Sequence, residues 1–133
     1  EYNLALGRCY MQLGNIEEAV TYLGNVVRIR PKNITGWVEL LKCLYQGKLF
    51  DEGIEYALYA YEQTDHKPVF IFFHAAFLFA VGKTKEGINT LASGLSINPK
   101  LIKQFIEINP SLLQNQQVVE LIARYKKNRN KNR

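Results

Sequence analysis

The chain has 133 residues, of which 47% are hydrophobic, so it can bury the core of one folded domain and is not an intrinsically disordered polypeptide. The formal net charge of +5 is concentrated at one end, because the last ten residues, RYKKNRNKNR, hold six Lys or Arg and no acid. The other 123 residues carry 11 basic and 12 acidic side chains, so the folded body adds no net positive field of its own.

The start of the sequence bears on the origin of the chain. It opens at Glu1 without an initiator methionine, and a helical pattern begins at once. We therefore expect a fragment of a longer protein with no secretory signal. Two cysteines without such a signal favour a reducing compartment, so we expect a cytoplasmic location.

Residues 1–99 repeat one pattern with a period of about 34 residues. GNIEEAV, KLFDEGI and KTKEGIN are three copies of one turn that runs into a helix. The copies span 1–33, 34–67 and 68–99, and each contains two apolar stripes at helical spacing. The predicted helices are 2–13, 16–29, 35–46, 50–63, 69–81 and 84–96.

The third copy contains the most apolar stretch of the chain, PVFIFFHAAFLFAVG at residues 68–82. Its apolar run has His74 in the middle and is shorter than the roughly 20 residues that cross a bilayer, so we expect no membrane span. A helix that is apolar on all sides is normally buried on all sides. Either another segment covers this helix, or Phe72 and Phe79 stay open for a binding partner.

Residues 100–133 depart from the repeat. LIKQFIEI predicts a short helix that Asn109-Pro110 ends, and QQVVELIARYKK carries a second apolar stripe. A solenoid needs an atypical end to cover its last hydrophobic face. We therefore expect a helical cap at 100–125 and a disordered basic tail at 126–133.

The repeated positions resemble the tetratricopeptide repeat (TPR), whose signature combines a Trp, a Leu-Gly, a Tyr, small residues and a Pro. The resemblance implies an all-α fold, a right-handed α-solenoid of antiparallel helix pairs with a C-terminal capping helix. The sequence departs from the signature at three places. Leu41 stands where a small residue is usual, and His74 stands where Leu is usual. The predicted turn glycine of the second repeat, Gly47, comes one residue early. The matching residues are Leu6, Gly7, Tyr10, Gly14, Ala19, Leu23 and Pro31, then Trp37, Leu40, Phe50, Gly53 and Ala60, then Ala75, Gly82, Gly87, Leu91 and Pro99.

Motifs for catalysis or metal binding are not found in the sequence. Gly82 and the two residues after it form a turn that lacks the upstream glycine of a P-loop. We interpret Cys9 and Cys43 as buried free thiols, and His74 as a core or half-buried histidine bonded to a backbone group. The acidic pair at 17–18 and the pair at 51–52 complement helix dipoles. We therefore expect no enzyme, no metal and no cofactor.

The resemblance implies that the first helices of the repeats line a concave, peptide-binding groove. In the best-known binding mode of the family, a set of Lys, Arg and Asn side chains binds the C-terminal carboxylate of a peptide. At the corresponding positions of this sequence only Arg8 has suitable chemistry. A groove with two cations at one end and aromatic residues at the other suits an amphipathic helix or an apolar peptide. The expected lining is Leu4, Arg8, Met11, Gln12, Val38, Lys42, Tyr45, Gln46, Val69, Phe72, Ala76 and Phe79.

These observations favour a non-enzymatic protein–protein interaction scaffold whose partner is a protein or peptide. Three alternatives stay open. The cap or other parts of a parent chain fill the groove. The module is a regulatory or assembly domain of a larger enzyme or complex and packs on its own neighbouring domain. The basic tail contacts nucleic acid.

Overall fold

The computed structural model describes residues 2–131, and side chains are described as far as Lys127. All regular elements assigned within this range are helices, which confirms the all-α fold class. No helix in it is long and apolar enough to cross a membrane. The elements are α1 (Tyr2–Gln12), α2 (Ile16–Ile29), α3 (Ile34–Gln46), α4 (Phe50–Gln63), α5 (Val69–Ala80), α6 (Thr84–Ile97), the 3-10 helix η1 (Pro99–Leu101), α7 (Ile102–Ile108), the 3-10 helix η2 (Pro110–Gln114) and α8 (Gln116–Lys131).

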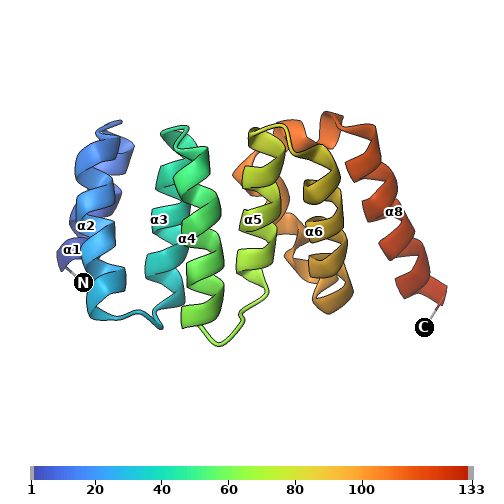
Figure 1. Ribbon diagram of the computed structural model, residues 1–133, viewed down its shortest axis with the longest axis horizontal. Coiled ribbons are helices and arrows are strands. Elements are labelled where there is room, and N and C mark those ends of the chain that lie inside the picture. The colour runs from blue at the N-terminus through green and yellow to red at the C-terminus, as the bar shows by residue number, and fades with distance from the viewer. Residues whose placement is uncertain (1, 132–133) are drawn as a thin grey trace.

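The first six helices form three antiparallel pairs that stand in a row, with the two ends of the chain at opposite ends of the row (Figure 1). This is a helical repeat solenoid, in which each pair buries its apolar faces against its neighbours. The predicted helices at 16–29 and 50–63 coincide with α2 and α4, and the other four agree within one residue at each end.

Close approach of the helices depends on small residues at the crossing points. A Cβ atom added to Gly7 of α1 would lie 2.6 Å from Leu23 Cδ2 of α2. A Cβ atom added to Gly53 of α4 would lie 2.2 Å from Phe77 Cε1 of α5. Both distances are too short for any larger side chain unless the facing side chain or the helices shift.

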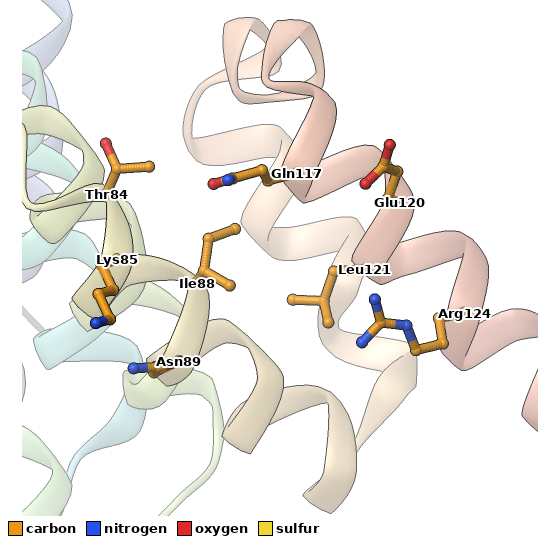
Figure 2. Close-up of a pocket in the computed structure, with 8 residues that line it drawn as sticks. All are labelled: Thr84, Lys85, Ile88, Asn89, Gln117, Glu120, Leu121 and Arg124. Atoms are coloured by element: carbon orange, nitrogen blue, oxygen red, sulfur yellow. The ribbon is translucent and has the colours of Figure 1, made fainter.

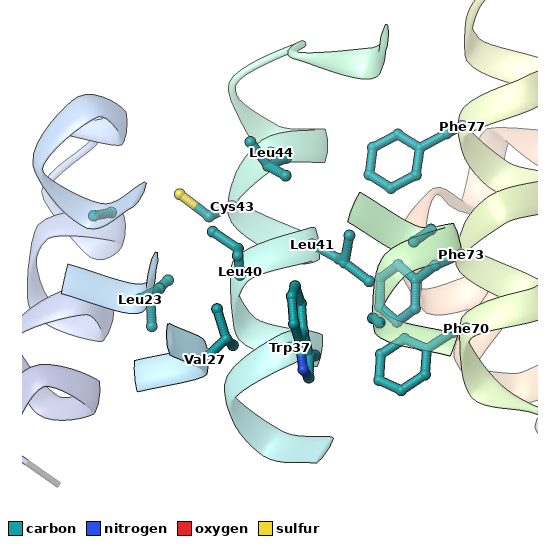
Figure 3. Close-up of a cluster of buried hydrophobic side chains, with 13 residues drawn as sticks. Leu23, Val27, Trp37, Leu40, Leu41, Cys43, Leu44, Phe70, Phe73 and Phe77 are labelled. Atoms are coloured by element: carbon teal, nitrogen blue, oxygen red, sulfur yellow. The ribbon is translucent and has the colours of Figure 1, made fainter. Parts of the chain in front are cut away.

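The core of the first two repeats continues into the third without a break (Figure 3). Trp37 and Leu41 of α3 are buried between Leu23 of α2 and Phe73 of α5. The indole Nε1 of Trp37 donates a hydrogen bond of 2.7 Å to the carbonyl oxygen of Pro31, which ties the loop between the first two repeats to this core.

The turn between α3 and α4 differs from its two counterparts. Gly14 and Gly82 end their turns with φ of 80° and 84°, in the left-handed region that glycine favours. Lys48 takes the equivalent place with φ of 61°, while Gly47, which we predicted to be the turn glycine, has φ of −80°. A Cβ atom on Gly47 would lie 2.5 Å from Ile16 Cγ2, so close packing rather than a positive φ requires glycine there.

Residues after α6 divide into two parts with different positions. α7 packs against α5 on the side of the solenoid formed by the first helices, and Figure 1 shows this orange segment behind α5 and α6. α8 packs against α6 at the end of the row, where Val118 and Leu121 are buried. The segment that we expected to be a single terminal cap therefore covers two different faces.

The C-terminal part of the chain also corrects the expected boundary between cap and tail. We expected disorder from residue 126, but α8 continues to Lys131. The last two residues of the predicted tail, 132 and 133, lie outside the described part of the chain.

Candidate functional site

Two thirds of the expected groove lining comes from α1 and α3, and these residues are at least partly accessible. The apolar members are half-buried, whereas the polar and charged members are exposed, so apolar atoms lie below a polar surface. The half-buried residues are Leu4, Met11, Val38 and Tyr45, and the exposed ones are Arg8, Gln12, Lys42 and Gln46.

The expected aromatic end of the groove, on α5, is closed. Phe72 and Ala76 are fully buried, while Val69 and Phe79 are half-buried. The cover is Phe105 of α7, whose ring centroid lies 6.4 Å from that of Phe72 and 6.2 Å from that of Phe79. Of the two alternatives that the sequence left open, a covering segment is the one found, and the expectation that Phe72 and Ala76 line an open groove was wrong. Burying these side chains against α7 removes their apolar surface from water.

A cleft of about 440 Å³ remains where α1 and α3 meet α7. Four of its lining residues belong to the expected groove, and α7 supplies two that the sequence analysis missed. We call it the concave cleft. Its lining residues are Met11, Lys42, Tyr45, Gln46, Glu107 and Ile108.

Tyr45 fixes the wall that α7 contributes to this cleft. Its hydroxyl oxygen accepts a hydrogen bond of 2.9 Å from Nδ2 of Asn109, the residue that directly follows α7. Its ring lies 5.2 Å from that of Phe50 and 5.5 Å from that of Phe77, measured between centroids. The end of α7 is thereby joined to the core of the second repeat.

Charge in the concave cleft is mixed. Nη2 of Arg8 lies 3.6 Å from Oε1 of Glu39, so part of the Arg8 charge is already compensated. Lys42 forms no ion pair with the side chains that the structure describes, and the carboxylate of Glu107 lines the same cleft. A ligand would therefore meet one cationic and one anionic group beside apolar atoms.

Comparison with known proteins agrees with this geometry over the first helix pair. The sequence model of the tetratricopeptide repeat family matches residues 1–33. The first helix pair is therefore similar to a tetratricopeptide repeat. Repeats of this family generally mediate protein–protein interaction. No curated protein matches the chain.

The two thiols of the chain differ in exposure, and both are free. Cys43 is buried, its Sγ donates to the carbonyl oxygen of Ile16 at 3.8 Å, and burial raises the pKa of its thiol. Cys9 is exposed, so the expectation that both thiols are buried was wrong for Cys9.

The other titratable groups singled out in the sequence lie on α2, α4 and α5. His74 is half-buried, and burial lowers its pKa, with the carboxylate of Glu86 opposing the shift. The two acidic pairs lie in the first turns of α2 and α4. Among the described residues no group of three or more His, Cys, Asp or Glu side chains could hold a metal ion.

A larger cleft, of about 570 Å³, separates α6 from α8 (Figure 2). Ile88 and Leu121 face each other across it, and Lys85, Glu120 and Arg124 lie at its margins. The Glu120 carboxylate accepts a hydrogen bond of 3.1 Å from Gln116 on the same helix. This cleft combines both signs of charge and holds no pair of groups suited to nucleophilic catalysis.

Proposed function

We propose that the chain is a non-enzymatic protein-interaction module that binds a peptide segment of a partner in the concave cleft. The observation that carries the proposal is the cleft of about 440 Å³ whose apolar atoms come from Met11, Tyr45 and Ile108. Pockets of this kind hold one or two apolar anchor side chains, and a few polar groups fix the orientation of the ligand.

The charged rim defines which peptide fits best. Lys42 attracts a carboxylate and Glu107 attracts a cation, so a segment with both charges on either side of an apolar anchor binds in one orientation. The exposed side chains of Arg8 and Gln12 extend the contact surface along α1. Phe72 and Ala76 take no part, because α7 covers them.

The experiment uses peptides selected from a display library on the intact chain, with affinity measured by fluorescence anisotropy. Lys42→Glu combined with Gln46→Arg alters two exposed cleft residues and should weaken the selected peptides at least about tenfold, a loss of about 1.4 kcal/mol. Lys83→Glu combined with Asn89→Arg makes the same charge change on exposed residues elsewhere and should leave affinity unchanged. Equal affinity for the cleft variant would refute the proposal.

A second candidate is packing on a neighbouring domain of the same protein, which two exposed apolar side chains of α1 and its following turn favour. Tyr2 and Leu13 are 77% and 73% exposed, the two highest values among the large hydrophobic side chains described. Tyr2 begins α1 and Leu13 follows its last residue, so exposed apolar side chains stand at both ends of this helix and suit a contact surface that runs along it. Tyr2→Ser combined with Leu13→Ser should leave the selected peptides bound and abolish a domain–domain contact.

A further inference from the structure

A separate cleft of about 420 Å³ lies beyond the third repeat, between α7 with the preceding η1 on one side and α8 on the other. We call it the terminal cleft. It combines an aliphatic floor with a basic rim. The floor is formed by Leu95, Ile102 and Ile122, and the rim by Lys100, Lys103 and Lys126.

The α8 wall of the terminal cleft is held in place by hydrogen bonds to α6. The hydroxyl of Tyr125, on α8, donates to the carbonyl oxygen of Ala92 at 3.1 Å and lies 2.8 Å from Oγ of Ser96. Leu95, on the next turn of α6, is almost fully buried beneath the cleft. The opposite wall, α7, is held by the packing of Phe105 on α5, so both walls belong to the folded structure.

The positive charge of the rim is not compensated within the described part of the chain. Lys100, Lys103 and Lys126 are exposed, and none of them forms an ion pair with a described side chain. The two acids of the C-terminal segment are used elsewhere, because Glu107 lines the concave cleft and Glu120 is bonded to Gln116.

We propose that the terminal cleft binds an acidic amphipathic helix of a protein partner. The aliphatic floor takes the apolar side chains of that helix, and carboxylates on both sides of them meet the three lysines. A groove between two helical walls suits an amphipathic helix, whose apolar residues recur at intervals of three and four positions. Complementary charge selects the acidic partner and speeds its association.

The floor argues against the other polyanions that a basic rim attracts. Nucleic acid is held by phosphate contacts together with stacking on aromatic rings, but leucine and isoleucine offer no stacking surface. Tyr125 is the aromatic side chain that lines the cleft, and its hydroxyl is already bonded within the fold. An anionic membrane is flat and would meet the rim without reaching the recessed floor.

The probe is a fluorescein-labelled peptide of about 16 residues with Leu at intervals of three and four positions and Glu at the other positions. Binding is measured at physiological ionic strength, where the Debye screening length is about 8 Å. The chain should bind it saturably. Lys100→Gln with Lys103→Gln and Lys126→Gln should weaken binding at least about tenfold, or about 1.4 kcal/mol. The matched control is Lys48→Gln with Lys67→Gln and Lys83→Gln, three exposed lysines outside the cleft, which should change affinity less than about twofold.

Each other outcome overturns the proposal. The peptide could fail to saturate the chain at about 1 mM, an affinity of only about 4 kcal/mol. Both triple variants could weaken it equally, or a peptide with Ser in place of Leu could bind as tightly, and either result would indicate unspecific charge attraction. Phosphatidylserine vesicles or a single-stranded oligonucleotide could bind through the three lysines in its place. Sedimentation could show a dimer that the cleft variant dissolves, which would make a second copy the occupant.

The same titration separates this proposal from that of the concave cleft. Lys42→Glu with Gln46→Arg leaves every residue of the terminal cleft in place and should leave affinity for the acidic probe unchanged. A failure at one cleft is therefore recognisable without reference to the other.

Discussion

Phe105 of α7 and Phe72 of α5 lie edge to face, with ring centroids 6.4 Å apart, and both side chains are fully buried. The chain thus places one of its own aromatic residues on the face of the third repeat that the first helices form. The groove expected from the first helices alone is shortened to the part that α1 and α3 line.

This contact predicts a large stability effect. Phe105→Ala should lower the free energy of unfolding by about 3–5 kcal/mol, because it removes a buried ring and leaves a cavity over Phe72. Urea unfolding followed by circular dichroism measures the change. Leu113→Ala, at a site 42% exposed, should stay within about 0.5 kcal/mol of the parent chain. Equal midpoints for the two variants would mean that α7 does not pack on α5 in solution.

The helix crossings make opposite predictions for two glycines. Gly53→Ala places a Cβ atom 2.2 Å from a ring carbon of Phe77 and should destabilise the fold by about 1–3 kcal/mol. Gly24→Ala meets nothing within 4 Å in the middle of α2 and should stabilise the fold by roughly 0.5–1 kcal/mol. Thermal melting distinguishes the signs, and a shift in the same direction for both would contradict the close contact of α4 with α5.

The helices could be predicted from the sequence because repetition supplies the same evidence three times. Ala19, Gly53 and Gly87 share one place in the repeat, and all three are buried where helices cross. A period of apolar residues depends on local geometry, so the positions of α2 and α4 follow from it directly. The same reasoning anticipates that a helix apolar on all sides, such as α5, needs a cover on each side.

The identity of that cover could not be derived from the pattern. α7 carries apolar residues that fit an end cap as well as a groove, and its path depends on η1 before it and on the Asn109 to Tyr45 hydrogen bond after it. Those contacts join residues far apart in the chain, and helical periodicity contains no information about them. Glu107 and Ile108 were missed as cleft residues for this reason.

The left-handed lysine predicts a stabilising substitution. Lys48 has φ of 61° at a place where the other two repeats have glycine. A residue with a side chain costs roughly 1–2 kcal/mol in this region, and glycine removes that cost. Part of the stabilisation is lost, because glycine also gives the unfolded chain more conformational freedom. Lys48→Gly should therefore raise the free energy of unfolding by about 0.5–1 kcal/mol. Lys67→Gly, at an exposed lysine with no positive φ, is the control and should not stabilise.

The thiols should react at very different rates. Cys9 is exposed, whereas Cys43 is buried and its pKa is raised by burial, so little reactive thiolate forms in the folded chain. With a disulfide reagent at pH 8, one thiol per chain should react at once and the second only as the chain unfolds. Cys9→Ser should remove the fast phase and keep the slow one. A fast phase in that variant would show that Cys43 is accessible.

His74 predicts how stability depends on pH. Burial lowers its pKa in the folded chain from the ordinary value of 6.5, so the unfolded chain binds its proton more readily. Above pH 6.5 both states are neutral at this residue and it contributes no pH dependence. As the pH falls below 6.5, the unfolded chain takes up the proton first, so the free energy of unfolding declines until the pH has passed the folded-state pKa. His74→Leu should lessen this decline, and urea midpoints from about pH 7.5 to 5.5 measure it for both chains. Parallel curves would show that His74 protonates as readily in the fold as in the unfolded chain.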